Sequence, residues 1–457
     1  MADPRIVIVG AGPAGVRAAE QVVEAGLRPI VVDENGNSGG QIYRRQPEGF
    51  RRPYRQLYGF EAKRAQALHE AFDALRDRVD YHLDTLVWNV YENAVHLVRD
   101  GVAEELPFDA LILATGATDR LLPIRGWTQP GCYSLGASQI ALKAQACAIG
   151  REPVFLGTGP LLYLVAYQYA KAGVRPAAVL DTSAFAGQAR AVVDLAARPG
   201  VLAKGLYYRA QLAARGIVIR NSVVPLEIEG SGAVRCVRYR LPDGSEHSVA
   251  CDAVGMGFHL RSETQLADLA RCQFVFDTTT GQWRPDMDAD GRTSVKGIYV
   301  AGDGARILGA DAAEVAGRLA ALAVLRDLGR PVSQSVVTRT QAKMARMERF
   351  SRGLATAFPW PADLARQVED DVVVCRCEVI TAGEIRAVAI AKDAPEMNRA
   401  KALSRVGMGR CQGRFCGSAA AEILAAARSE PLKTVGRLRG QAPVKPLSIA
   451  VTKAPAS

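Results

Sequence analysis

Four of the nine cysteines in this chain fall in one short stretch near its C-terminal end. Cys375 and Cys377 are separated by one residue, and Cys411 and Cys416 follow with four residues between them. Two close pairs of thiols can converge on one metal centre while the chain between the pairs folds. Because thiolate is a soft ligand, the quartet predicts either a zinc ion or a [2Fe–2S] cluster.

The spacing of the two cysteine pairs bears on this choice. Zinc sites usually pair cysteines with two to four residues between them, so Cys-x-Cys fits zinc poorly while Cys-x4-Cys fits it. Zinc would make the region a structural element. A cluster would make the chain an electron-transfer protein, and the rest of the sequence favours that second interpretation.

A strand–turn–helix pattern at the N-terminus carries the sequence Gly10-Ala11-Gly12-Pro13-Ala14-Gly15. This G-x-G-x-x-G order allows a tight turn, close approach of backbone to a pyrophosphate, and close helix–strand packing. Asp33 ends the next expected strand, where it can bind a ribose hydroxyl. The residues predicted to contact this nucleotide are Gly10, Gly12, Pro13, Ala14, Gly15, Asp33, Glu34, Gly40 and Gln41. Further along, Thr115 and Gly116 resemble the strand-end turn that touches the flavin in a glutathione-reductase-like fold, and Gly302 and Asp303 resemble the segment whose aspartate binds the FAD ribitol.

A second, weaker turn of the same kind follows in the middle of the chain. Gly157 and Gly159 are present, but Leu162 occupies the position of the third glycine. Asp181, at the end of the following strand, could select NAD over NADP because its charge would repel a 2′-phosphate. A bulky third residue pushes helix and strand apart, so this site is expected either to bind NAD(H) or to be a structural remnant.

The sequence offers no residue that we predict to be catalytic. No Cys-x-x-Cys or Cys-x4-Cys lies near either nucleotide turn, which excludes disulfide-reductase chemistry there. The five histidines are scattered, and for His259 a structural role is favoured over a place in the cofactor cleft. A flavoprotein without substrate chemistry of its own is expected to use a substrate site on another chain.

The surrounding elements predict an α/β, glutathione-reductase-like flavoprotein with two dinucleotide-binding domains and a small C-terminal [2Fe–2S] domain. The FAD-type domain is expected to be discontinuous, with the NAD-like domain inserted into it. The expected boundaries are residues 1–125 and 256–330 for the FAD-type domain, 126–255 for the NAD-like domain, 331–369 for a linker with some helix, 370–430 for the cluster domain and 431–457 for an extended tail.

Charge and composition limit the binding partners and the cellular location that we expect for the protein. The net charge of +10 lies wholly after residue 329, where 21 Lys and Arg face 11 Asp and Glu. Nucleic-acid binding is disfavoured because no recognition motif accompanies the charge. The excess could offset the charge of a cluster, since Arg376, Arg410 and Arg414 flank the cysteines, or dock an acidic partner. No apolar run long enough for a membrane span and no room for a signal peptide are found, so a cytoplasmic protein is expected.

The motifs together resemble a known family. The segments Cys375–Glu378 and Gly407–Cys416 look like the bacterioferritin-associated-ferredoxin-type [2Fe–2S] domain. The head of the chain, with Gly39-Gly40-Gln41-Ile42-Tyr43-Arg44, is similar to the α subunits of octopine/nopaline dehydrogenases, D-hydroxyproline dehydrogenase, heterotetrameric sarcosine-oxidase-like enzymes and, more distantly, hydrogen cyanide synthase. The similarity covers essentially the whole chain.

This resemblance implies an electron-transfer subunit. In such complexes a glycine-oxidase-like β subunit carries its own FAD and oxidises the C–N bond of an amino acid, opine or secondary amine. An FMN commonly lies between the subunits, a small γ subunit can be present, and electrons leave to a downstream acceptor. For this chain the resemblance implies FAD, or a shorter adenine nucleotide, in the first turn, and a [2Fe–2S] cluster on the four cysteines.

Two other functions stay open at this point. The second nucleotide turn and Asp181 would suit a self-sufficient NADH-dependent reductase. A chain whose nucleotide sites are both remnants would serve only as a scaffold for its partner. The substrate is not readable from this sequence, because the residues that select it are expected on another polypeptide.

Overall fold

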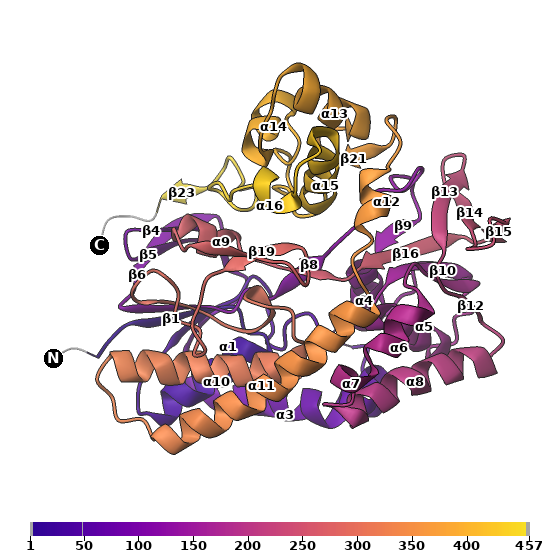
Figure 1. Cartoon of the computed structure of the whole chain (residues 1–457). Coiled ribbons are helices and arrows are strands. Elements are labelled where there is room, and N and C mark those ends of the chain that lie inside the picture. The colour runs from indigo at the N-terminus through magenta and orange to yellow at the C-terminus, as the bar shows by residue number, and fades with distance from the viewer. Residues whose placement is uncertain (1–2, 48, 454–457) are drawn as a thin grey trace.

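The computed structural model describes residues 3–47 and 49–453, and its core is built from two parallel sheets (Figure 1). The first sheet has the order β20-β7-β1-β2-β3. Its strands are β20 (Ile298–Val300), β7 (Ala110–Leu113), β1 (Ile6–Val9), β2 (Ile30–Val32) and β3 (Asp80–His82). Because β20 returns from far along the chain to pair with β7, the first domain is discontinuous, as the sequence predicts.

Helices cover one face of the first sheet. They are α1 (Pro13–Glu24), α3 (Ala62–Leu75) and α10 (Ala310–Asp327). Proline at the first helical position starts α1, and its apolar residues, among them Val16 and Val22, lie on the buried face. A side chain at Gly317 of α10 would come within 1.9 Å of the Ala14 carbonyl oxygen, so glycine is what allows α1 and α10 to pack this closely.

The opposite face carries an antiparallel meander and the end of the chain. The meander is β4 (Leu86–Tyr91), β5 (Ala94–Arg99) and β6 (Val102–Pro107). The tail runs over this region, and β23 (Thr452–Lys453) adds a parallel strand beside β6. The tail expected to be extended from residue 431 begins instead with a short helix, Leu432–Val435, and only its last part is attached to the first domain by main-chain pairing. Residues 454–457 lie outside the described residues.

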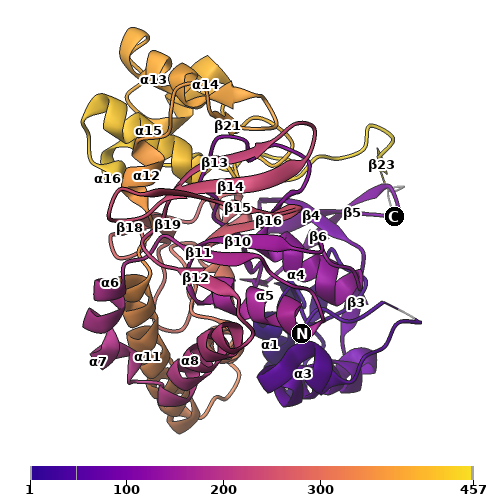
Figure 2. The same cartoon turned by 90° about the vertical axis from the view of Figure 1, so that its right-hand side faces the viewer.

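The second sheet has the order β12-β11-β10-β16-β9. Its parallel strands are β12 (Val218–Arg220), β11 (Ala178–Asp181), β10 (Pro153–Thr158), β16 (Ala253–Phe258) and β9 (Cys132–Ser134). Helices α4 (Leu135–Ala144), α5 (Pro160–Lys171) and α8 (Pro199–Ala214) accompany it, together with the meander β13 (Val224–Gly230), β14 (Val234–Arg240) and β15 (Glu246–Ala250) (Figure 2). The chain crosses between the two sheets on the antiparallel pair β8 (Ala117–Asp119) and β17 (Leu260–Ser262).

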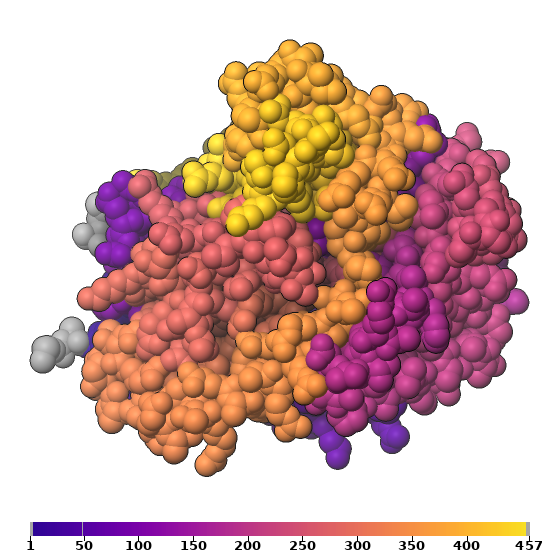
Figure 3. All heavy atoms as spheres, in the orientation of Figure 1, coloured from indigo at the N-terminus to yellow at the C-terminus, as the bar shows by residue number. Residues whose placement is uncertain are grey.

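A small helical domain containing the four cysteines lies on top of this body (Figures 1 and 3). Its elements are α12 (Ala362–Arg366), β21 (Val373–Cys375), β22 (Ile380–Thr381), α13 (Ala382–Ala391), α14 (Met397–Ser404), α15 (Gly417–Arg428) and α16 (Leu432–Val435). Thr381 and Glu384 form a reciprocal cap at the start of α13, which fixes where this helix leaves the cysteine hairpin. Val374 and Ile423 are completely buried, so the small domain has its own packed core.

The remaining short elements connect these layers. They are α2 (Tyr54–Tyr58), α6 (Phe185–Arg190), α7 (Val192–Leu195), α9 (Gln265–Leu269), the pair β18 (Phe274–Asp277) and β19 (Gln282–Pro285), and the 3-10 turns Gly59–Glu61, Arg76–Arg78 and Gly302–Gly304. Within the described residues, no helix has both the length and the apolar character needed to cross a membrane.

The segment expected to be a linker is more ordered than the sequence indicates. Residues 331–369 contain α11 (Gln334–Ala357), a 24-residue helix, whereas the prediction allowed only some helix. Its buried positions, such as Met344, Met347 and Phe350, form a narrow stripe on an otherwise polar and basic helix. A stripe this narrow is a weak pattern in sequence, although it is enough to pack α11 against α10 and α7.

One expected domain boundary also falls in the wrong place. The prediction divides the chain between residues 255 and 256, but β16 runs unbroken from Ala253 to Phe258 in the second sheet. Gly255 and Gly257 weaken the strand pattern in the sequence. Side chains there would collide with Phe155 and Leu135, so the glycines are part of the strand packing and not the sign of a boundary.

Candidate functional site

The first glycine-rich turn has the geometry that nucleotide binding requires. Gly10 has a φ of 104°, and an added Cβ would lie 2.4 Å from the Ala114 carbonyl oxygen. A Cβ at Gly15 would lie 1.8 Å from the carbonyl oxygen of Gly10. Both positions therefore need glycine for the helix to start directly above the strand, where its N-terminal end can face a phosphate.

A second pair of glycines faces this turn. A side chain at Gly40, whose φ is 61°, would come within 2.9 Å of the Gly12 Cα atom, and the Gly39 amide donates to the Ala11 carbonyl oxygen at 2.8 Å. The two backbone segments form a cradle that a single Cβ would fill. The residues present therefore fit the pyrophosphate of a dinucleotide such as FAD.

Asp33 is fixed at the end of β2 and is 7 % exposed. Its carboxylate accepts hydrogen bonds from the Ala11 amide at 2.6 Å and from the Asn35 amide at 2.7 Å. Burial raises the pKa of Asp33, and the backbone donors oppose that shift. The neighbouring Glu34 side chain forms an ion pair with Lys445, so the tail passes over this edge of the site.

The parts predicted to lie near the flavin also meet in space. A side chain at Gly304 would come within 2.7 Å of the Thr115 hydroxyl, which places the Gly302–Gly304 turn against the end of β7. Asp303 accepts hydrogen bonds from the amides of Leu308 and Gly309, and burial raises its pKa. The fold thus brings together three regions that are about 100 and 190 residues apart along the chain.

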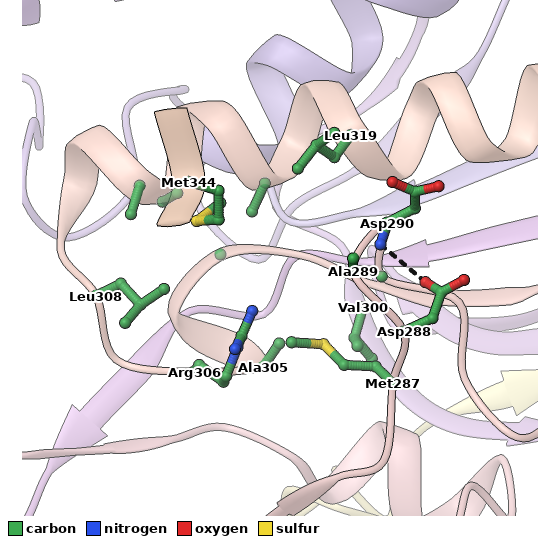
Figure 4. Close-up of a pocket in the computed structure, with 15 residues that line it drawn as sticks. Met287, Asp288, Ala289, Asp290, Val300, Ala305, Arg306, Leu308, Leu319 and Met344 are labelled. Carbon is green, nitrogen blue, oxygen red and sulfur yellow. Dashed lines mark hydrogen bonds between the residues drawn. The ribbon is translucent and has the colours of Figure 1, made fainter. Parts of the chain in front are cut away.

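A small pocket lies beside this turn but does not form part of the nucleotide cradle (Figure 4). About 370 Å³ of space, part of it open to solvent, lies between the loop at residues 287–291, the Gly302–Gly304 turn and α10, with Met287, Leu308 and Met344 around it. Its two acidic side chains, Asp288 and Asp290, each form an ion pair with Arg292 at 3.1 Å. The residues of the glycine-rich turns do not line it, so we assign it no ligand.

The second glycine-rich turn is filled by side chains of the protein itself. Leu162 is completely buried, in the position where the first turn has Gly15. Asp181 is also completely buried, and it accepts hydrogen bonds from the Tyr163 hydroxyl at 2.5 Å and the Ser183 amide at 2.8 Å. Arg209 in turn donates to Tyr163. This carboxylate is engaged in the core, which disfavours a role in binding a ribose.

His259 closes the second turn from the other side. A Cβ on Gly159 would lie 3.3 Å from the His259 ring, and the His259 Nε2 atom donates to the carbonyl oxygen of Phe358. Burial lowers the pKa of His259 to about 4. The ring is therefore neutral near pH 7, and it lies at the end of β16 against the second turn.

The four cysteines converge at one end of the small domain. Cys375 and Cys416 are each 1 % exposed, while Cys377 and Cys411 lie partly exposed. A hydrogen bond from the Cys416 thiol lowers the pKa of Cys375 to about 6 and that of Cys411 to about 5, and raises the pKa of Cys416 itself. Backbone amides, those of Gly407 and Phe415 among them, also point at the sulfurs, as they do in iron–sulfur sites.

Each of the four thiols interacts with at least one of the others. Cys375 contacts Cys416, Cys416 contacts Cys411, and Cys411 contacts Cys377. Within residues 3–47 and 49–453, no three His, Cys, Asp or Glu side chains have the arrangement of a single-ion site. The choice of metal therefore still follows from the spacing, because Cys375-x-Cys377 fits zinc poorly.

The cysteine loop is bonded directly to the body. Arg414, beside Cys411, forms an ion pair with Glu263 at 2.5 Å, and the Glu263 carbonyl oxygen accepts a hydrogen bond from the Thr115 hydroxyl at 2.5 Å. Arg261 donates to the carbonyl oxygens of Gly413 and Arg414. Sequence reasoning did not single out Glu263 or Arg261, because their partners lie about 150 residues away.

Comparisons with known proteins agree with this architecture. The family model for pyridine nucleotide-disulphide oxidoreductases matches residues 4–323, and that for the BFD-like [2Fe–2S] binding domain matches residues 373–426. The chain is 39 % identical to the opine oxidase A subunit of Agrobacterium tumefaciens (strain Ach5), over 97 % of this chain and 90 % of that one. It is 32 % identical to the HcnB subunit of hydrogen cyanide synthase from Pseudomonas aeruginosa, over 97 % of both chains.

A solved structure with the same fold is that of L-proline dehydrogenase from P. horikoshii, with a TM-score of 0.73 and 19 % identity, over 98 % of this chain and 79 % of that one. The fold and site together define a two-domain flavoprotein of the pyridine nucleotide-disulphide oxidoreductase class with an added [2Fe–2S] domain. Within that class, the chain belongs to the family of the opine oxidase A subunits.

The comparisons confirm several of the predictions. The fold class, the family, the oxidoreductase class and the cofactors FAD and [2Fe–2S] are those expected from the sequence. The chain is a flavin-dependent oxidase-type subunit with an iron–sulfur domain. The assignment of individual residues to each cofactor, the domain boundaries, the FMN at a subunit interface and the cytoplasmic location stay predictions.

Proposed function

We propose that this chain is the electron-transfer subunit of a heteromeric dehydrogenase that oxidises an amino acid, an opine or a secondary amine on a partner subunit. Because a flavin takes up two electrons and a [2Fe–2S] cluster takes up one, the two groups together can divide an electron pair. The relatives at 30 % identity or more are themselves named as subunits, those of opine oxidase and hydrogen cyanide synthase, which supports a partner for this chain.

One observation carries the proposal. Thr115, predicted to lie beside the flavin, bonds to Glu263, and Glu263 pairs with Arg414, which lies three residues after Cys411. Arg414 also donates to the Cys411 carbonyl oxygen at 3.3 Å. Three contacts therefore join the proposed flavin side to the cysteine loop. These residues hold the two sites at a fixed separation and keep water out of the junction, since Arg414 is 8 % exposed.

In this proposal Gly10, Gly12, Gly15 and Asp33 hold the FAD, and Cys375, Cys377, Cys411 and Cys416 hold the cluster. Electrons would leave on the side of Cys377 and Cys411, the two partly exposed ligands. Arg376 and Arg410 are exposed there, and Val379 is 66 % exposed. An apolar contact ringed by cations suits an acidic electron acceptor.

The test compares the chain alone with the chain co-expressed with a candidate β subunit, a glycine-oxidase-like flavoprotein. Both samples are assayed with a panel of imino acids, opines and secondary amines and an artificial electron acceptor. Turnover is expected only with the partner present. Robust turnover by the chain alone would contradict the proposal, whichever substrate is used.

The second candidate, a self-sufficient NADH-dependent reductase, is disfavoured by the closed second turn. Mixing NADH with the FAD-loaded chain in a stopped-flow spectrometer should leave the flavin absorbance unchanged for seconds. A scaffold without redox function is tested by iron and flavin analysis of the purified complex, which we expect to contain both.

A further inference from the structure

The cysteine loop, residues 411–416, is bonded to an arginine of the body through its carbonyl groups. Arg261, on β17, donates from Nη1 to the carbonyl oxygens of Gly413 and Arg414 at 3.1 and 3.0 Å. A Cβ placed on Gly417, the first residue after the loop, would lie 3.9 Å from the same nitrogen. Figure 1 shows the small domain above α9 and β19, where the two parts of the molecule meet.

A second side chain of the body, that of Gln265, bonds to the same loop. Gln265 is the first residue of α9, and its Nε2 atom donates to the Gln412 carbonyl oxygen at 2.7 Å. The side chain is 8 % exposed, and its Oε1 atom has no hydrogen-bond partner among the described residues. The bond to the loop is therefore what orients this side-chain amide.

Two of these carbonyl groups belong to peptide units whose amides face the other way. In a trans peptide the C=O and N–H bonds point in opposite directions, and within the described residues only the bond before Pro443 is cis. The body holds the Gln412 and Arg414 carbonyl groups on its own side of the loop. The amides of Gly413 and Phe415, which complete these two units, therefore point away from the body and towards the sulfurs.

The Gly413 and Phe415 amides have the Cys411 sulfur as their acceptor. Within residues 3–47 and 49–453, neither amide donates to a backbone carbonyl oxygen. The Cys416 thiol lowers the pKa of Cys411 to about 5, and both amides act in the same direction. Hydrogen bonds to the sulfurs are among the features that set the reduction potential of an iron–sulfur cluster.

Arg261 also places a positive charge beside the loop. Arg261 and Arg414 share one carboxylate, that of Glu263, whose Oε2 atom lies 2.5 Å from the Arg414 Nε atom. Arg261 itself forms no ion pair in the part of the chain that the structure describes, so one positive charge remains unbalanced. Uptake of an electron makes a cluster more negative by one charge, and a fixed cation nearby favours that reduced form.

A second arginine nearby does not reach the loop. About 750 Å³ of space, part of it open to solvent, lies between the small domain and the body, and Arg120, Arg261, Gln265 and Gln282 are among the residues that line it. The Arg120 guanidinium donates to two carbonyl oxygens of the body. The Gln282 amide donates to the Leu260 carbonyl oxygen at 3.2 Å, so Gln282 is a matched control for Gln265.

We propose that Arg261 and Gln265 are positioning residues that raise the reduction potential of the [2Fe–2S] cluster. Both act through peptide units of the cysteine loop, by aiming N–H groups at the Cys411 sulfur, and Arg261 adds its charge. Because both side chains belong to the body, the potential depends on how the small domain is docked. This inference rests on the proposed function only in taking the four cysteines as cluster ligands, and it requires neither a partner subunit nor turnover.

The test is a redox titration of the full-length chain with its cluster and FAD bound, with dithionite as the reductant and mediator dyes. The electron paramagnetic resonance signal of the reduced cluster reports its one-electron midpoint potential. In Arg261→Met we expect the equilibrium constant for reduction to fall about tenfold or more, which lowers the midpoint potential by about 59 mV or more. Arg261→Lys keeps the charge but not the planar fork, so the constant should fall by less than about threefold.

The pair Gln265→Met and Gln282→Met tests the contribution of the peptide units without a change of charge. Gln265→Met removes one donor to the loop at nearly constant volume, and the reduction constant should fall about threefold. Gln282→Met makes the same chemical change at the wall of the same cavity and should leave the potential unchanged. Iron content and the midpoint of thermal unfolding are measured for every variant, because a merely structural role would change these and not the potential.

The outcomes separate this inference from the proposed function. If Arg261→Met loses its iron, Gln265→Met and Arg261→Lys decide the question. The inference is overturned if Gln265→Met has the potential of the unsubstituted chain, if its potential rises, or if Gln282→Met shifts the potential as much. Absence of iron from the unsubstituted chain would overturn the ligand assignment as well, whereas an unmoved potential at full iron content overturns this inference alone.

Discussion

The two glycine-rich turns follow the same strand–turn–helix plan, yet only the first forms an open cradle. In the first, Gly12 faces the backbone of Gly40, and nothing larger than a hydrogen atom separates helix from strand at Gly15. In the second, Leu162 occupies the third position and the His259 ring lies against Gly159. Two glycines and an aspartate at a strand end are therefore enough to indicate the strand–turn–helix fold. They are not enough to indicate that the turn binds a nucleotide.

The aspartates show the same contrast. Asp33 accepts hydrogen bonds mainly from backbone amides of its own turn. Asp181 is enclosed by Tyr163, Asn221 and Ser183, with Arg209 behind the tyrosine. Side chains from three separate elements thus occupy the place of a ribose, and burial raises the pKa of the carboxyl group.

The largest effect is expected from Gly15→Val. The new Cβ would lie 1.8 Å from the Gly10 carbonyl oxygen, so the helix must move off the strand. We expect loss of bound FAD and a loss of about 3 kcal/mol or more in stability. The flavin content after purification measures the loss of FAD, and the midpoint of thermal unfolding measures the loss of stability. Gly205→Ala, where a Cβ meets open space in α8, serves as control and should keep its flavin.

The variant Cys411→Ser tests whether the cluster and the first nucleotide site can be lost independently of each other. Its thiolate is one of four ligands, so the visible absorbance of the cluster should disappear while FAD remains bound. The control is Cys147→Ser, at an exposed cysteine more distant in sequence from the other three ligands. It should change neither the cluster absorbance nor the bound FAD. Full iron content in Cys411→Ser would refute the ligand assignment.

Leu162→Gly restores the third glycine of the second turn. Removing a fully buried leucine leaves a cavity, and we expect a loss of about 3 kcal/mol in the free energy of unfolding. NADH should still not bind, because Asp181 and His259 stay in place. Leu162→Met, with a similar volume, should cost less than about 1.5 kcal/mol. NADH binding by Leu162→Gly in a fluorescence titration would show that the leucine alone closes the site.

The smallest effect concerns the pH dependence of His259. Its folded pKa of about 4 lies below the ordinary 6.5, since burial and the Arg120 charge disfavour the protonated ring. The neutral ring therefore contributes fully to the free energy of unfolding above pH 6.5. As the pH falls towards 4, the protein loses roughly 2 kcal/mol of this free energy, because the unfolded chain binds the proton more tightly. His259→Asn, which tolerates the φ of 71°, should lack this loss. Urea midpoints at pH 7, 5.5 and 4.5 compare the two, and parallel profiles would count against a buried neutral ring.

Much of the fold was predictable because its patterns are local. The runs at Ile6–Val9 and Ala110–Leu113 are continuous and apolar, as in buried parallel strands. Pro13 and Pro160 each stand at the first position of the helix that follows a glycine-rich turn, where proline is favoured. The polar helix α11 and the glycine-containing strand β16 were less predictable, because the partners that stabilise them come from distant parts of the chain.

The sequence by itself determined the family, the cofactor types and the order of the sites, since glycine turns and cysteine pairs depend on spacing within a few residues. Only the tertiary structure decided which of the two glycine-rich turns is open, and which arginine side chains are buried without a carboxylate partner. Leu162 in the sequence gave a warning about the second turn, but His259 and Phe358 meet there from positions 99 residues apart. Arg120 and Arg261 likewise become neighbours of one cavity only when the two strands that join the sheets pair, because burial and charge compensation are properties of the packed chain.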